Sequence, residues 1–83
     1  MPYIDQNDRS KFQSVLDKLP RMKSKGELEF CIYRLMQLYM ADREERYSDL
    51  HDTVYAAAHC ADEFRRRRLD ARENEARLMN GDV

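Results

Sequence analysis

Glycine, proline and cysteine are scarce in this sequence, with two of each among 83 residues, and tryptophan is absent. Because Gly26 and Gly81 are the only glycines, the chain has no glycine-rich loop that would cradle a phosphate group. No serine or cysteine stands in the sharp turn that exposes a catalytic nucleophile. The acidic pair Glu27 and Glu29 lacks the helical spacing that one metal site needs. We therefore expect a protein that is not an enzyme and that uses neither a metal nor a cofactor.

Two further absences concern the cellular compartment. Cys31 and Cys60 are too few for a disulfide framework, so we expect them to be reduced thiols. No apolar run approaches the ~18 residues of a membrane-spanning helix, and the N-terminus lacks the charged and then apolar pattern of a secretory signal. These features predict a cytoplasmic protein without a membrane partner.

An excess of charge of one sign is also missing, since 15 basic and 16 acidic residues leave a net charge of −1. A near-neutral chain lacks the high net charge that keeps polypeptides disordered. It also lacks the overall basic charge that is typical of nucleic-acid-binding domains. Nucleic acids and nucleotides are therefore less favoured as partners than proteins.

What the sequence does contain is helical patterning. Asp8 is the expected N-cap of a first helix, which Pro20 ends because the residue before a proline is pushed out of the helical region. Ser24 followed by Glu27 is a capping box, and the broad apolar arc that follows predicts a core helix in contact with both others. The sequence thus predicts one all-α domain over residues 1–83, with three helices at about 8–19, 25–43 and 48–80.

The third helix is the most distinctive, because it contains neither proline nor glycine between its expected N-cap Ser48 and its expected C-cap Gly81. It would be about 50 Å long, whereas a compact domain of this length has a diameter of about 30 Å. Its apolar residues recur at the 3-4 spacing of helices that pack against other helices. We therefore expect a helical-bundle homodimer or higher oligomer, joined through Leu50, Val54, Ala57, Ala61 and Phe64.

Arg65, Arg68 and Arg72 share one face of this helix if its spacing runs without a break. Such a face suits a phosphate group or a nucleic-acid backbone, and it is the candidate ligand site. The competing interpretation is a solvated charged surface, because acidic residues precede and follow the arginines and form i,i+4 pairs with them. Arg68 falls in line with the apolar residues, where an uncompensated charge is costly. We expect an anion to meet it, either Glu75 of a second subunit or a phosphate-bearing ligand.

Five short segments of the chain also form an ordered set. They are Met-Pro-Tyr-Ile at 1–4, Gly-Glu-Leu-Glu-Phe-Cys-Ile-Tyr-Arg-Leu at 26–35, Tyr47 with Leu50, Glu63 with Phe64, and Asn-Gly-Asp-Val at 80–83. In order and spacing this set resembles an uncharacterised family of short proteins from phages and some bacteria. The resemblance spans nearly the whole chain. It implies a phage origin and supplies no mechanism.

Together these patterns favour a small phage-type accessory protein, a non-enzymatic protein-binding module that acts through a helical oligomer. Its expected partners are copies of itself and a host protein, in the cytoplasm of the host cell. The alternative function is the sequestering of an anionic ligand such as a nucleotide, or contact with nucleic acid, through residues 65–72. Salt dependence separates the two, since phosphate contacts weaken steeply with salt and apolar packing does not.

Overall fold

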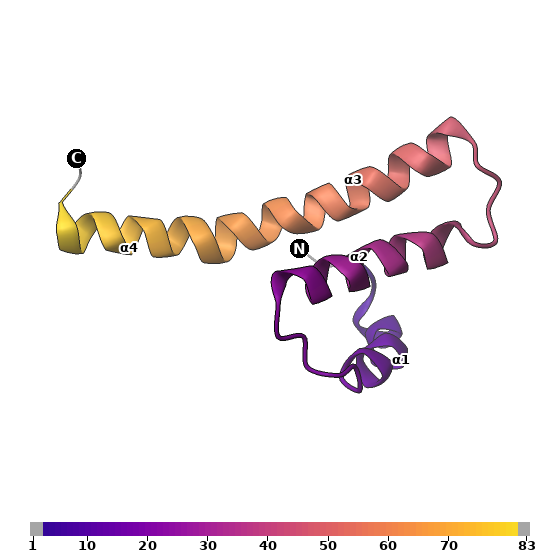
Figure 1. Cartoon of the computed structure of the whole chain (residues 1–83), viewed down its shortest axis with the longest axis horizontal. Coiled ribbons are helices and arrows are strands. Elements are labelled where there is room, and N and C mark those ends of the chain that lie inside the picture. The colour runs from indigo at the N-terminus through magenta and orange to yellow at the C-terminus, as the bar shows by residue number, and fades with distance from the viewer. Residues whose placement is uncertain (1–2, 82–83) are drawn as a thin grey trace.

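A computed structural model describes residues 3–81, and every regular element among them is a helix. In chain order these are α1 (Gln6–Leu16), α2 (Lys25–Met40), α3 (Tyr47–Phe64), the π-helical segment η1 (Arg65–Leu69) and α4 (Asp70–Asn80). The last three form one continuous long helix (Figure 1). The prediction of three helices with a long C-terminal one is confirmed. Residues 1–2 and 82–83, which carry part of the resemblance noted above, lie outside the described residues.

The arrangement is open and elongated. Helices α2 and α3 lie side by side as an antiparallel hairpin, and the long helix then extends well past the end of α2 (Figure 1). No Cα atom of α1 comes within 8 Å of a Cα atom in another helix, so α2 packs on α3 alone. The expectation that α2 contacts both other helices is therefore wrong. The radius of gyration is 16.6 Å, against about 12 Å for a compact chain of this length.

The start of α2 follows the predicted capping box closely. The Ser24 hydroxyl accepts a hydrogen bond from the Glu27 N–H at 3.1 Å. The Glu27 carboxylate in turn accepts one from the Lys23 N–H at 2.8 Å, one residue before the N-cap. These bonds satisfy donors that a helix start otherwise leaves unpaired. The sequence located this boundary to the residue.

The other helix ends differ from the prediction by one to three residues. Helix α1 begins after Asp5 rather than Asp8, and it ends at Leu16 because the N–H groups of Lys18 and Leu19 bond only three residues back, in the tightened turn before Pro20. Helix α2 ends at Met40 rather than 43. Helix α3 begins after Arg46, so Ser48 lies inside the helix and is not its N-cap.

The early end of α2 has a specific cause in Arg43. Its guanidinium donates a hydrogen bond to the carbonyl oxygen of Tyr39 and stacks over the Tyr39 ring at 3.7 Å from the centroid. The side chain thus bonds to the Tyr39 carbonyl oxygen, which would accept a backbone hydrogen bond if α2 continued for another turn. It also adds a cation–π contact. At the far end of the long helix, Gly81 has a φ of 85°, and the prediction that it ends the helix is confirmed.

The segment η1 breaks the regular spacing that the sequence suggested for residues 48–80. The Asp70 N–H donates to the Arg65 carbonyl oxygen, five residues back instead of four. Such a turn contains one more residue than an α-helical turn, so every later residue is offset by about 100° around the axis. Leu69, not Arg68, then comes into line with Phe64. The expectation of an unbroken 3-4 spacing through Arg68 is wrong.

This fold has no hydrophobic core of its own. Between residues 3 and 81, Thr53 is the one buried side chain, at 7% exposed, and its hydroxyl donates a hydrogen bond to the Asp49 carbonyl oxygen at 2.7 Å. No hydrophobic side chain in the same range is buried. The helices are thus formed by local hydrogen bonding and one shallow hairpin contact, and their apolar faces remain uncovered.

Candidate functional site

The predicted self-association residues form one surface, which we call the α3 stripe. Leu50, Val54 and Phe64 are 45%, 55% and 65% exposed, and Ala61 is also exposed. Ala57 alone is half-buried, beside the α2–α3 contact. The stripe is therefore present and apolar along α3, and a single chain leaves most of it open to solvent. Its members are Leu50, Val54, Ala57, Ala61 and Phe64.

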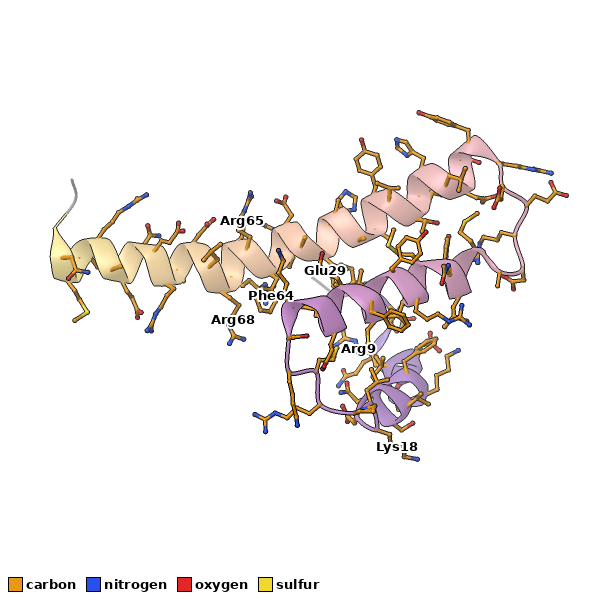
Figure 2. All side chains as sticks on the ribbon, viewed as in Figure 1. Arg9, Lys18, Glu29, Phe64, Arg65 and Arg68 are labelled. Carbon is orange, nitrogen blue, oxygen red and sulfur yellow. The ribbon has the colours of Figure 1, made fainter. Side chains whose placement is uncertain are left out.

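The side of α3 that meets α2 is a different one. It is marked by the buried Thr53 and the half-buried Asp49, which lie roughly 60° and 100° around the helix from the centre of the α3 stripe at 100° per residue. A small hydroxyl and a carboxylate at this contact explain why the hairpin buries so little apolar surface. Leu50, Val54 and Ala61 of the α3 stripe stay exposed to solvent, whereas Ala57 is half-buried. Figure 2 shows Phe64 on the side of the long helix that faces α2.

A second apolar surface, which we call the α2 stripe, runs along α2. The half-buried Met36 and Met40 mark the side of α2 near α3, and Figure 2 shows Glu29 between the two helices. The stripe lies about 90° around the helix from that side. Its four members are all between 41% and 51% exposed. They are Leu28, Ile32, Leu35 and Tyr39.

The three arginines of the candidate ligand site are not brought together. Figure 2 shows Arg65 on one side of the long helix, and Arg68 and Phe64 on the other. Arg65 forms an ion pair with Asp62 at 2.8 Å, and Arg72 lies 3.7 Å from the carboxylate of Glu75. The predicted shared face is wrong, because η1 lengthens the turn between these residues.

Arg68 differs from its neighbours in having no carboxylate within 4 Å among the described residues. Its guanidinium instead lies 5.6 Å from the centroid of the Phe64 ring, a cation–π distance. Glu75, the carboxylate expected to face Arg68 in another subunit, is paired with Arg72 in its own chain. Among the described residues, Arg68 is thus the member of the predicted site without a carboxylate partner.

Glu63 is the most engaged acidic group of this region. Its carboxylate accepts hydrogen bonds from both Arg66 and Arg67 and is only 19% exposed. The hydrogen bond from Arg67, followed by the charge of Arg66, holds the pKa of Glu63 below its usual value. Glu63 and Arg67 form an i,i+4 pair of the kind that the sequence predicts, whereas Asp62 and Arg65 pair across three residues. Arg66 and Arg67 belong to a charged surface.

The N-terminal segment also reaches this region. Desolvation raises the pKa of the Tyr3 hydroxyl, and the nearby Cys60 and Glu63 raise it further. Cys60 and Glu63 belong to the end of α3, far along the chain from Tyr3. Cys31 and Cys60 are both free thiols, half-buried and exposed respectively.

Aromatic rings line another face of α3. His51 lies between Tyr47 and Tyr55, with ring centroids 5.7 Å and 4.2 Å away, and His59 follows Tyr55 at 6.2 Å. The rings contact one another in a row instead of converging on a point. Nowhere in residues 3–81 do three histidine, cysteine or acidic side chains gather as metal ligands would.

An open groove of about 450 Å³ lies at the start of α2, and its walls are mostly apolar. The carboxylate of Glu27 in its wall is already bonded to the Lys23 N–H. The groove therefore offers contact surface. Its lining residues are Leu19, Pro20, Arg21, Met22, Ser24, Gly26, Glu27, Phe30 and Cys31.

In addition, no helix in the described part of the chain is long and apolar enough to cross a membrane.

The fold and these surfaces define a class of protein, namely small all-helical chains whose apolar stripes are left uncovered by their own fold. Residues 1–83 match a protein family described as a domain of unknown function (DUF6899), and the chain belongs to this family. The expected membership of an uncharacterised family is thereby confirmed. Comparison with curated proteins and with solved structures found no match.

Proposed function

We propose that this protein is a non-enzymatic helical module that associates with itself and, as an oligomer, binds another protein. The observation that carries the proposal is the missing core. Burial of apolar side chains is the main force that stabilises folded chains, and no hydrophobic side chain among residues 3–81 is buried. Association with other helices supplies the burial that the single chain lacks.

The solvent-exposed area of the chain is larger than that of a compact protein of the same mass. The chain exposes 8084 Å², whereas a compact protein of this mass would expose about 5,200 Å². The excess of roughly 2,800 Å² exceeds the ~800 Å² that each partner buries in a standard protein–protein interface. An excess of this size is typical of protomers taken out of an obligate assembly.

We assign the self-association to the α3 stripe. Its residues follow the spacing of helix-packing positions, and its alanines at 57 and 61 allow a second helix to approach closely. The offset at η1 prolongs the stripe through Leu69, which is 50% exposed. A helix from another copy, laid along this line, would cover Val54, Phe64 and Leu69 together.

The test is sedimentation equilibrium of variants that place a carboxylate in the α3 stripe. Val54→Asp and Ala61→Asp should break the contact between α3 stripes and lower the number of copies in the assembly, because a buried unpaired carboxylate is strongly destabilising. Tyr55→Asp is the matched control, since it adds the same charge on the row of aromatic rings, about 140° away from the stripe. A wild-type protein that sediments as a folded monomer at tens of micromolar would refute the proposal.

The biological setting that we propose follows from the family resemblance. It is a phage accessory protein that acts in the host cytoplasm on a host protein. Co-purification of the tagged oligomer from host extract, with the Val54→Asp variant as control, tests this. A partner retained by the oligomer and lost from the variant supports the setting, whereas equal recovery with both contradicts a role for assembly.

Anion binding is the second candidate, and the observation that favours it is the guanidinium of Arg68, which has no carboxylate within 4 Å among residues 3–81. One available cation is a weaker basis than the three that the sequence suggested, since Arg65 and Arg72 are paired with carboxylates. Binding of a nucleotide or a nucleic acid would weaken steeply as salt is raised. Partner binding that is insensitive to salt would exclude this function.

A further inference from the structure

We propose that the α2 stripe is a second self-complementary interface, at which two copies of this chain pair antiparallel. The inference rests on the proposed self-association but concerns a different surface. The stripe residues follow one another by four, three and four positions, which is the spacing of seam residues in paired helices. They are Leu28, Ile32, Leu35 and Tyr39.

No part of the described chain packs a helix on this seam. Helix α3 meets the side of α2 that carries Met36 and Met40, and no Cα atom of α1 lies within 8 Å of a Cα atom of α2. Figure 1 shows α1 joined to α2 through the connecting segment and set apart from it. The seam therefore spans most of α2 with about half of each side chain open to solvent.

The excess exposed area of the chain is larger than one interface at the α3 stripe would bury. An interface of standard size removes ~800 Å² from each partner, which is under a third of the roughly 2,800 Å² excess of this chain. Even with the α3 stripe fully covered, the remaining excess is large enough for a second interface. The α2 stripe is the other continuous row of apolar side chains with seam spacing.

We assign a second copy of the chain to the α2 stripe, because the apolar residues of the stripe can pair with those of another copy. In an antiparallel pair with the two-fold axis midway between Ile32 and Leu35, each Ile32 faces the partner's Leu35. In the same pair Leu28 faces the partner's Tyr39. Such an isologous contact uses one patch twice, as two-fold symmetric dimers do.

Charge favours the antiparallel direction. The segment before the seam is basic, with Arg21, Lys23 and Lys25, whereas residues 42–46 after it carry three acidic and two basic side chains, a net charge of −1. The antiparallel pair places these segments opposite each other, whereas a parallel pair would bring the basic segments of both copies together. The antiparallel pair is also favoured because the dipoles of its two helices point in opposite directions.

Two different isologous interfaces on one chain join more than two copies. The α2 and α3 stripes are both distinct from the α2–α3 contact, so one copy can use both at once. The expected assembly is a tetramer, a dimer of dimers, in which each interface can be broken separately.

Sedimentation equilibrium and native mass spectrometry of three variants test this. Leu35→Asp should reduce the tetramer to a dimer held by the α3 stripes, and Val54→Asp to a dimer held by the α2 stripes. Gln37→Asp, which adds the same charge on the far side of α2, should remain tetrameric. If Leu35→Asp keeps the wild-type stoichiometry, the α2 interface is refuted while the proposed function stands. If Val54→Asp alone has no effect, the α3 assignment fails and the α2 interface stands.

A crosslinking experiment tests the direction and remains informative if an Asp variant fails to fold. With Cys31 and Cys60 replaced by alanine, Leu35→Cys and Tyr39→Cys are oxidised in turn. In the antiparallel pair the two copies of position 35 lie about 5 Å apart along the axis, and those of position 39 about 17 Å apart. A disulfide between chains is therefore expected at 35 and not at 39. Crosslinking at both positions would show a parallel pair, and crosslinking at neither would overturn the inference.

Discussion

Deletion of Arg68 should leave both the long helix and the assembly intact, because η1 holds one residue more than an α-helical turn needs. The Asp70 N–H reaches the Arg65 carbonyl oxygen across five residues. Removal of one residue between them makes this the ordinary bond over four, and the direction of α4 is kept. Arg68 is the suitable residue to remove, since the neighbouring arginines hold the ion pairs of the segment.

The magnitude follows from which contacts are lost. Deletion of Arg68 sacrifices no backbone hydrogen bond, so the free energy of unfolding should stay within about 1 kcal/mol of the wild type. Deletion of Ala58, in the regular part of α3, instead rotates every later residue by about 100°. It carries Phe64 and Leu69 off the α3 stripe, and withdrawal of two large apolar side chains from an interface costs roughly 3–6 kcal/mol.

The assay is denaturant unfolding followed by circular dichroism, with sedimentation of the same samples. The Arg68 deletion should match the wild type in helicity and stoichiometry, and the Ala58 deletion should lose stability and dissociate. If the two deletions were equally damaging, η1 would not act as a one-residue insertion, and the placement of Leu69 on the α3 stripe would be refuted.

Two further predictions concern local contacts. Ser24→Ala should lower the free energy of unfolding by about 1 kcal/mol, because the Glu27 N–H loses its acceptor, whereas Ser24→Asp should retain most of it. Denaturant titration measures both, and equal effects of the two variants would contradict the capping role. Glu63 has a lowered pKa in the folded chain, so its ion pairs stabilise the fold above the usual carboxyl pKa of 4.5, and this contribution is lost as the pH falls through the lowered value. The unfolding midpoint of Glu63→Gln should therefore show a smaller decrease on acidification than that of the wild type, and parallel pH profiles would rule this out.

Much of the architecture could be predicted because its signals are local. The Ser24 capping box and the terminal Gly81 are defined by a few neighbouring residues, and both are found where the sequence placed them. The end of α2 could not be predicted in the same way. There a side chain, that of Arg43, competes for the carbonyl oxygen of Tyr39, and sequence spacing does not reveal such competition.

The π-helical turn was missed for a related reason. Four consecutive arginines contain no apolar residue that would mark the helix register, so an extra residue leaves no trace in the pattern. Without that offset, helical spacing places Arg65 and Arg68 on one face. The exposed α3 stripe, by contrast, follows directly from the spacing of Leu50, Val54 and Phe64.

The residues of the α2 stripe are apparent in the sequence, where their pattern predicts a core position. The apolar arc of α2 is broad enough to touch two helices, and a compact three-helix packing was the simplest arrangement that covers it. The structure divides this arc between a side with Met36 and Met40 near α3 and the uncovered Leu28, Ile32, Leu35 and Tyr39. The position of α1, which depends on contacts distant in sequence, decides between the two arrangements.

The missing core has a consequence for how the amount of this protein is controlled. When folding is completed only on association, protein concentration itself acts as a stabilising ligand. For a dimer, each tenfold dilution then removes about 1.4 kcal/mol of apparent stability. Copies made in excess, or before enough partners have accumulated, would remain open to proteolysis, since cleavage follows the population of the unfolded form. The uncovered apolar stripes would thus make the chain long-lived only above a threshold abundance, and its activity would switch on steeply as expression rises.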